Sequence, residues 1–218
     1  SSVLVGDFIY SRAFQVLVKI GDMRIMKIIA DTTNKIAEGE VLQLIAKNNP
    51  NASEANYMQV IENKTAILFQ AAAQCGALLA NADEASEKGL RNFGKSIGMA
   101  FQLIDDVLDY AGDATDLGKN IGDDLAEGKP TLPLIYAIEK SDKQQQKLIQ
   151  RALKTEQLNP EMLKDVIEIV RHSGGLEYTQ GLAKEQSKAA LNCLQALPDS
   201  EYRQAMEAMV NFSLSRKS

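Results

Sequence analysis

One segment constrains the fold of this chain more than any other. Residues 94–113, "GKSIGMAFQLIDDVLDYAGD", place aspartates among Phe, Leu, Ile, Val and Tyr. At about 100° of rotation per residue, Asp105, Asp106 and Asp109 share one stripe of a helix with Gln102. The rest of the circumference is apolar, so the pattern predicts a helix that is buried around most of its surface.

Two glycines, Gly94 and Gly98, extend the polar stripe toward the N-terminus. One face of the helix therefore carries carboxylates at one end and almost no side chain at the other. We interpret this face as the lining of a cavity. The alternative is a solvated acidic face at the end of a core helix, because charged side chains are mostly exposed in globular proteins.

The other segments predict an all-α protein. Apolar residues recur at helical spacing near residues 3–20, 23–48, 54–80, 84–111, 131–140, 142–155, 160–171, 175–196 and 199–215. Gly, Pro, Asn, Asp and Ser separate these segments, and no alternating run bounded by turns predicts a strand. The one long irregular segment, residues 111–130, is rich in Gly and Asp, and loops of that length are usually functional or disordered.

The aspartate stripe predicts a metal site. Unpaired carboxylates are costly to bury, and three of them in one pocket repel each other. Ligands that are all oxygen favour hard cations, chiefly Mg²⁺, and the absence of a nearby His or Cys argues against zinc.

Basic residues near this stripe indicate a phosphate ligand. Lys64 and Thr65 lie in the middle of an apolar helical segment, while Lys119 and Lys129 each follow a Gly in the irregular segment. Mg²⁺ commonly binds through a few carboxylates plus substrate phosphates, and Lys supplies point charges to the remaining oxygens. For Lys64, the alternative is a surface lysine whose stem covers apolar surface.

Composition excludes two function classes. The 218 residues carry a net charge of −5 with scattered Lys and Arg, whereas a nucleic-acid surface needs a basic stripe. No apolar run approaches the roughly 18 residues needed to span a bilayer. We interpret Cys75 and Cys193, the two cysteines, as buried free thiols of a reducing compartment, which predicts a cytoplasmic protein.

These motifs resemble the trans-polyprenyl diphosphate synthase family. "FQLIDDVLDY" with "GDATDLGKNIGDDLAEGKPTLPLIYA" is similar to the family's second aspartate-rich motif and the loop after it, and "NKTA" is similar to its Lys-Thr pair. "SVLVGDFIYSRAF" and "AEGEVLQL" resemble the two helices that follow the first aspartate-rich motif. The resemblance covers essentially the whole chain and is most specific over residues 101–130.

The resemblance implies a bundle of long helices around a deep cavity, usually a homodimer. It implies that an allylic diphosphate, held by Mg²⁺, ionises and is attacked by isopentenyl diphosphate, so that the chain grows by five carbons. The product would be a long-chain polyprenyl diphosphate for quinone side chains, in loose membrane contact at most.

Site roles follow from the resemblance position by position. Asp105 would coordinate one Mg²⁺, with Asp106 and Asp109 supporting it. The allylic diphosphate would be held by Lys64, Thr65 and Lys119. Gln102 would lie near the reacting carbons or a diphosphate, and Lys129 would close the loop over the site. Weaker candidates for the lining or the second substrate are Glu40, Gln43, Arg216 and Lys217.

One departure from the family pattern bears on activity. The first aspartate-rich motif, the arginines after it and the N-terminal site for isopentenyl diphosphate are expected before Ser1. We therefore expect residues 1–218 to be a single all-α domain without its N-terminal helices and to be inactive alone. Elongation by a chain that begins at Ser1 would contradict this expectation.

Two alternatives keep the fold but change the function. The chain could be a non-catalytic subunit of a heteromeric prenyl synthase, although such subunits often lose the aspartates or lysines that are intact here. It could also be a terpene cyclase or a head-to-head condensing enzyme. The lysines of the irregular segment and the Lys64-Thr65 pair favour chain elongation.

Overall fold

The computed structural model describes residues 2–111, 121–155 and 157–216. These residues form helices, turns and short connections, and no β-strand occurs among them. The prediction of an all-α protein is confirmed.

The helices match the periodic segments of the sequence closely. In chain order they are α1 (Ser2–Ile20), α2 (Met23–Ala46), α3 (Glu54–Ile61), the π-helix η1 (Glu62–Ala66), α4 (Ile67–Leu79), α5 (Glu84–Ala111), α6 (Asp123–Ala126), α7 (Leu132–Lys140), α8 (Lys143–Leu153), α9 (Pro160–His172), α10 (Gly175–Leu194) and α11 (Glu201–Ser215). Two features differ from the prediction. A π-helical turn interrupts the helix expected over 54–80, and the short α6 lies within the segment expected to be an irregular loop.

Polar side chains fix where several helices begin. Asp22 caps α2 by accepting a hydrogen bond from the backbone N–H of Arg24, and Ser53 and Ser200 cap α3 and α11 in the same way. Asn159 caps α9, in which Pro160 occupies the first turn. These residues accept hydrogen bonds from, or remove the need for, backbone N–H groups that have no partner within the helix. The residues that separate the helical segments in the sequence therefore also determine where the next helix begins.

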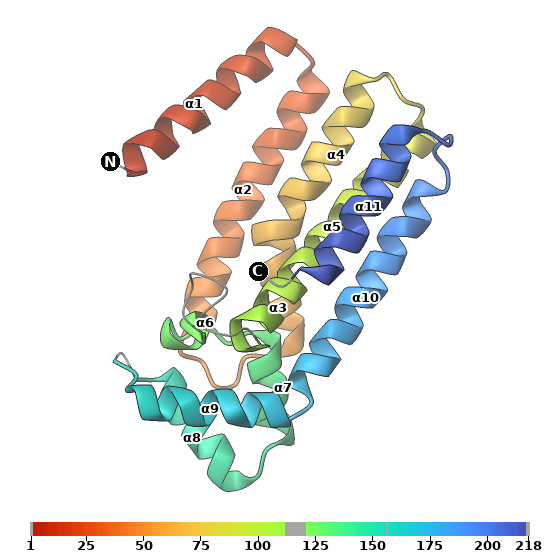
Figure 1. Ribbon diagram of the computed structural model, residues 1–218. Helices are drawn as coiled ribbons and strands as arrows, with labels where there is room; N and C mark the ends of the chain where they lie inside the picture. The colour runs from red at the N-terminus through yellow and green to blue at the C-terminus, as the bar shows by residue number, and fades with distance from the viewer. Residues whose placement is uncertain (1, 112–120, 156, 217–218) are drawn as a thin grey trace.

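The long helices pack side by side, with α5 between α4 and α10 (Figure 1). At one end of this bundle, α7, α8 and α9 pack together across the ends of the long helices. Helix α1 departs from the bundle at its junction with α2 (Figure 1). Several of its apolar side chains are exposed, among them Val3, Leu4 and Phe8.

Helix α5 supplies much of the core. Leu103, Ile104 and Met99 pack with α3, η1, α7 and α10, whereas Phe93 and Ile97 pack with α10 and α11. A helix covered on so many sides presents little of its surface to solvent, as its nearly continuous apolar circumference predicted. The polar stripe of α5, which carries Gln102 and the three aspartates, is therefore left to face a single region of the structure.

The glycines of that stripe have a different role from the one expected. A Cβ at Gly98 would lie 2.6 Å from Ala66 Cα, and one at Gly94 would overlap Phe69 O and lie 2.7 Å from Gln70 Cα. Gly94 and Gly98 are buried at the contact of α5 with η1 and α4, so the prediction that they line a cavity is wrong. They permit close helix packing, which a side chain would prevent.

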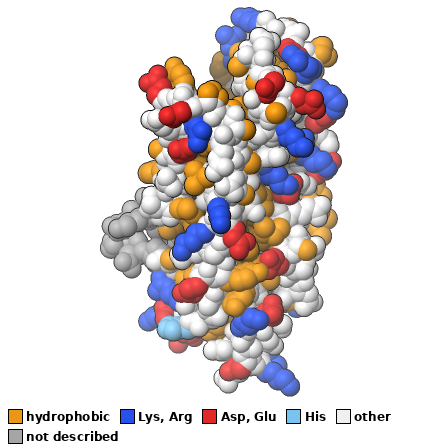
Figure 2. Space-filling view, turned by 90° about the vertical axis from the view of Figure 1, so that its right-hand side faces the viewer, with side chains coloured by type: hydrophobic (Ala, Val, Ile, Leu, Met, Phe, Trp, Pro, Cys, Tyr) orange, Lys and Arg blue, Asp and Glu red, His pale blue; other side chains and the backbone are white. Residues whose placement is uncertain are grey.

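No helix in the described part of the chain is both long and apolar enough to cross a bilayer. On the face turned toward the viewer in Figure 2, acidic and basic side chains intermingle, with apolar side chains between them. That face carries no continuous basic stripe. The two cysteines, Cys75 and Cys193, are free thiols that are half-buried rather than fully buried as expected.

Candidate active site

A cavity of about 450 Å³ lies between α5, the α3–η1 segment, the C-terminal part of α2 and residues 121–131. Its polar lining includes most of the residues singled out in the sequence. These are Gln43, Lys64, Thr65, Gln102, Asp105, Asp106, Asp109 and Lys129, together with Asn56, Tyr57, Asp123, Asp124, Glu127 and Thr131. The cavity therefore collects side chains that lie up to about ninety residues apart in the sequence.

The three aspartates of α5 all face this cavity but differ in exposure. The Asp105 side chain is 40% exposed, whereas Asp106 is buried at 2% and Asp109 is half-buried. A carboxylate with accessible oxygens can bind a ligand from the cavity directly. Asp105 and Asp109 are thus better placed for such contact than Asp106.

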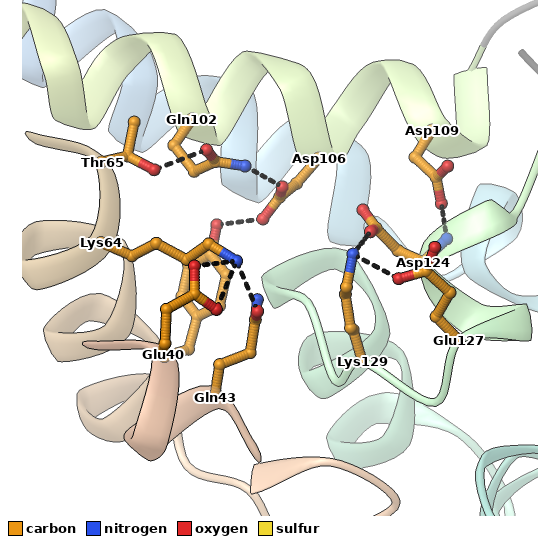
Figure 3. A network of polar contacts seen from close by, with 11 residues as sticks. Glu40, Gln43, Lys64, Thr65, Gln102, Asp106, Asp109, Asp124, Glu127 and Lys129 are labelled. Carbon is orange, nitrogen blue, oxygen red and sulfur yellow. Dashed lines mark hydrogen bonds and ion pairs between the residues drawn. The ribbon is translucent and has the colours of Figure 1, made fainter. Parts of the chain in front are cut away.

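Both oxygens of Asp106 accept hydrogen bonds from neutral donors. Tyr57 Oη donates to Oδ2 at 2.5 Å, and Gln102 Nε2 donates to Oδ1 at 2.8 Å. Gln102 Oε1 in turn accepts a hydrogen bond from Thr65 Oγ1 at 3.0 Å (Figure 3). Tyr57 could not be identified from the sequence, because its partner lies 49 residues away and nothing in its own apolar segment marks it.

The surroundings favour the neutral forms of two of these acids. Burial, followed by the negative charge of Asp124, raises the pKa of Asp106 to about 8. The same two causes, in the same order, raise the pKa of Asp109 to about 7. A cation bound in the cavity would offset the negative charge that contributes to both raised pKa values.

Lys64 lies across the cavity from α5. Its Nζ is 2.7 Å from Gln43 Oε1 and 3.0 Å from Glu40 Oε1, so both weaker candidates from α2 contact it (Figure 3). Lys64 and Thr65 belong to the π-helix η1, whose wider turn is a feature found frequently at functional sites. Close packing supports this turn, since a Cβ at Gly39 would lie 2.8 Å from Lys64 N.

Lys129 approaches the same space from another direction. Its Nζ is 3.0 Å from Asp124 Oδ1 and 2.8 Å from Glu127 Oε2. Although partial burial acts against it, pairing with Glu127 and Asp124 raises the pKa of Lys129 above its ordinary value, so Lys129 remains charged. Figure 3 shows the polar side chains of α5 directed toward the space that Lys64 and Lys129 flank.

Short backbone contacts hold the segment that carries Lys129. The N–H of Gly122 donates to Asp109 O at 2.8 Å, and the N–H of Asp124 donates to Asp109 Oδ2 at 3.3 Å. The N–H of Asn48, at the end of α2, donates to Gly128 O at 2.8 Å. The segment is thereby attached both to α5 and to α2.

The C-terminal end of the described chain also reaches α5. Arg216 Nη2 lies 3.8 Å from Asp105 Oδ1, and the guanidinium lies over the Phe101 ring with its Cζ 4.1 Å from the centroid. This places one of the weaker candidates beside an aspartate of the stripe. Lys119 and Lys217, which the sequence also singled out, lie outside the described residues.

His172, the single histidine of the sequence, belongs to the last turn of α9 and is largely exposed. In the described residues, no three or more His, Cys, Asp or Glu side chains are arranged so that they could hold a metal ion. The predicted Mg²⁺ site therefore rests on the chemistry of the donors. Those donors are oxygen atoms, they face a cavity, and two of the acids have raised pKa values that a cation would offset.

The chain is similar to known proteins over nearly its whole length. Residues 1–170 match the family model described as Polyprenyl synthetase. The chain is 48% identical over 216 residues to an octaprenyl diphosphate synthase of Haemophilus influenzae, and 47% identical over 217 residues to one of Escherichia coli. Each alignment covers 99% of this chain, but it covers 65% and 67% of the respective relatives.

Solved structures of polyprenyl synthases also match the whole chain. A polyprenyl synthase from Caulobacter crescentus complexed with calcium and isoprenyl diphosphate matches with a TM-score of 0.94 and 41% identity, covering 100% of this chain and 66% of that one. A decaprenyl diphosphate synthase from Rhodobacter capsulatus matches with a TM-score of 0.91 and 37% identity, covering 100% and 67%. The chain thus spans about two thirds of the length of these relatives.

Proposed function

Because the chain belongs to the polyprenyl synthetase family, we propose that the cavity beneath α5 serves prenyl chain elongation, and that residues 1–218, which span about two thirds of the relatives' length, do not elongate by themselves. In this reaction, isopentenyl diphosphate is condensed with an allylic diphosphate. The bond between C1 of the allylic substrate and its diphosphate oxygen breaks, and the electron pair leaves with pyrophosphate. The double bond of isopentenyl diphosphate forms the new C–C bond, and loss of a proton restores a double bond.

One observation carries the proposal: the cavity sets a row of carboxylates opposite lysines that come from separate segments. Asp105 and Asp109 lie on α5 and line the cavity. Lys64 and Lys129 flank the space in front of Asp109 (Figure 3). A diphosphate is an anion that cannot approach carboxylates without a cation between them, yet it is attracted to lysines directly. This arrangement therefore suits a diphosphate together with a hard divalent cation.

Mg²⁺ fits the donors present, with Asp105 and Asp109 as the residues that would hold it. When bound, Mg²⁺ supplies positive charge that stabilises the negative charge developing on the departing pyrophosphate. Asp106 is engaged with Tyr57 and Gln102, so we assign it a supporting role.

The chain's own groups bind and orient the diphosphate. Lys64 has an ammonium group that now contacts Glu40 and Gln43 and that is positioned to turn to phosphate oxygens. Thr65 supplies a hydroxyl on the adjacent position, and Lys129 a second charge from the other side of the cavity. Apolar lining residues, Val60, Ile61 and Leu108, exclude water from an allylic cation, which water would otherwise quench. Lys119 keeps its proposed role at the diphosphate.

The product and the assembly are inferred with the relatives as a guide. We propose a long-chain product, with octaprenyl diphosphate as the first candidate, since relatives of that name are 47% and 48% identical to this chain. We also propose a homodimer, as expected from the resemblance, and a cytoplasmic location, which the free cysteines support.

A binding experiment tests the proposed function. Calorimetry would follow titration of the protein with farnesyl thiolodiphosphate, an allylic analogue whose sulfur slows ionisation, with Mg²⁺ and with EDTA. We expect binding that requires Mg²⁺ and that weakens at least tenfold in Asp105→Asn. Equal binding in EDTA, or no binding by folded protein, would contradict the proposal.

A further inference from the structure

A chain of hydrogen bonds crosses the cavity wall from α3 to η1. Thr65 in η1 donates to Gln102 in α5, Gln102 donates to Asp106, and Tyr57 in α3 donates to the other oxygen of Asp106. The three distances are 3.0, 2.8 and 2.5 Å, in that order. The contacts therefore link three elements whose positions define one side of the cavity.

The direction of these hydrogen bonds is determined by chemistry. The NH₂ of Gln102 can only donate, and it faces Oδ1 of Asp106, while the Tyr57 hydroxyl donates to Oδ2. The amide oxygen of Gln102 must then face Thr65, and the Thr65 hydroxyl becomes the donor. The orientation of Asp106 thus determines the orientation of a hydroxyl two contacts away.

Tyr57 forms the end of the hydrogen-bond chain that lies farthest from Thr65. Its side chain is buried, with 7% of the residue exposed, and Asp106 is buried at 2%. A buried carboxylate with one fixed oxygen could still rotate, whereas donors on both oxygens define the plane of the group. Tyr57 supplies the second donor from a separate helix, at a sequence distance of 49 residues.

We propose that Tyr57 is a positioning residue for diphosphate binding, acting through Asp106 and Gln102 on Thr65. This inference rests on the proposed function, which places the diphosphate next to Thr65. Tyr57 lines the cavity, but its phenol is engaged with Asp106 rather than directed at a ligand. Its contribution is to keep the groups that face the ligand in a fixed arrangement before the ligand binds.

The chain contains a matched control. Tyr178 Oη also donates to a carboxylate on another helix, Glu54, at 2.9 Å, but it does not line the cavity. Tyr57→Phe and Tyr178→Phe each delete one hydroxyl that donates to a carboxylate. An effect on binding that both variants share is due to the loss of a hydrogen bond as such. An effect confined to Tyr57→Phe shows that the hydrogen bond at the cavity contributes to binding.

The experiment measures binding of inorganic pyrophosphate by calorimetry in the presence of Mg²⁺, with the melting temperature as a measure of folding. Outer contacts to metal-site residues typically contribute 10- to 100-fold to affinity. We expect Tyr57→Phe to weaken Mg²⁺-dependent pyrophosphate binding about tenfold and Tyr178→Phe to leave it within twofold. Both variants should remain folded at the temperature of the titration.

A double-substitution cycle separates positioning from a general loss of packing. Thr65→Val removes the hydroxyl at the other end of the hydrogen-bond chain, and Tyr57 and Thr65 share no direct hydrogen bond. Independent sites give additive effects, whereas members of one network do not. We expect the Tyr57→Phe/Thr65→Val variant to bind pyrophosphate almost as well as Thr65→Val alone.

Two results would overturn the inference, and they are distinguishable. If the parent protein binds pyrophosphate with Mg²⁺ and Tyr57→Phe binds it equally well, Tyr57 only satisfies a buried carboxylate. Fully additive effects in the cycle would lead to the same conclusion. If the parent itself shows no Mg²⁺-dependent binding, the proposed function fails, and this inference fails with it.

Discussion

The aspartates of α5 occupy three different environments within one helical stripe. Asp105 is accessible from the cavity and lies near Arg216, Asp106 is buried between neutral donors, and Asp109 accepts a backbone N–H from the segment that carries Lys129. We therefore expect neighbouring residues of the same type to have separate roles. In particular, burial makes Asp106 suited to orienting other groups rather than to direct contact with a cation.

These environments predict an unusual dependence of stability on pH. The pKa values of Asp106 and Asp109 are raised in the folded protein to about 8 and about 7, from a usual value of 3.8. The folded state thus holds protons that the unfolded state releases, so this contribution to stability is present below pH 4 and is lost as pH rises toward 8. We expect the free energy of unfolding in EDTA to fall over this range and Mg²⁺ to restore part of it at pH 8.

Urea denaturation at several pH values, with Asp106→Asn beside the parent, checks this expectation. One group with a shifted pKa contributes about 1.4 kcal/mol per pH unit at most. The Asp106→Asn variant should therefore show a shallower decline, by about 1 kcal/mol per pH unit between pH 5 and 7. Parallel curves for the two proteins would show that Asp106 titrates normally.

Substitution of Lys64 tests whether this side chain binds the diphosphate in the cavity. Hydrogen bonds to charged groups contribute about 1.5–3 kcal/mol, which corresponds to roughly 10- to 100-fold in affinity. We expect Lys64→Ala to weaken binding of the thiolodiphosphate analogue by that factor. Lys95→Ala is the control, because Lys95 also forms an ion pair with a glutamate, Glu62, but does not line the cavity. Equal losses in the two variants would argue against a specific role for Lys64.

At the scale of elements, the position of the π-helix η1 depends on the absence of side chains on its neighbours. A Cβ at Gly39 of α2 would lie 2.8 Å from Lys64 N, and one at Gly98 of α5 would lie 2.6 Å from Ala66 Cα. Backbone atoms cannot move aside as the end of a flexible side chain can. The two glycines thus determine how closely α2 and α5 approach the turn that carries Lys64 and Thr65.

We expect Gly98→Ala to destabilise the protein by about 1–3 kcal/mol, because overpacking forces backbone shifts. It should also weaken analogue binding, since η1 would be displaced. Gly181→Ala in α10 is the control: a Cβ there meets nothing within 4 Å, so better helix propensity should raise stability by roughly 0.5–1 kcal/mol. Urea midpoints measure both effects, and stabilisation by Gly98→Ala would show that the helices can separate freely.

The helices and the aspartate stripe could be predicted because both follow from local periodicity. The π-helical turn could not, since "ENKTA" has the composition of an ordinary helix and its geometry depends on packing against α2 and α5. Tyr57 and its contact with Asp106 depend on tertiary structure for the same reason. The interpretation of Gly94 and Gly98 was wrong because a side-chain-free face suits a cavity and a close helix contact equally well.

At the scale of the whole molecule, helix α1 presents apolar side chains that the described residues leave exposed. Leu4, Phe8 and Ile9 are 74%, 69% and 62% exposed, and α1 diverges from the bundle (Figure 1). Contiguous exposed apolar surface usually marks an interaction site. A second copy of the chain is the occupant that the proposed homodimer supplies.

We expect Phe8→Asp to shift the protein from dimer to monomer at micromolar concentration, as measured by sedimentation equilibrium. Phe212→Asp is the matched control, because Phe212 is 68% exposed on α11, across the bundle from α1 (Figure 1). A dimer that survives Phe8→Asp, or a parent protein that is monomeric, would exclude this face as the dimer interface.

Elongation of an allylic diphosphate at the cavity beneath α5 is tested most directly by an elongation assay. The polypeptide, as its gene encodes it, is incubated with farnesyl diphosphate and labelled isopentenyl diphosphate, with Mg²⁺ or EDTA, and the products are sized by reverse-phase chromatography. We predict a Mg²⁺-dependent series of products that ends at one long chain and that is lost in Asp105→Asn. No incorporation by the folded protein at any Mg²⁺ concentration would contradict the claim.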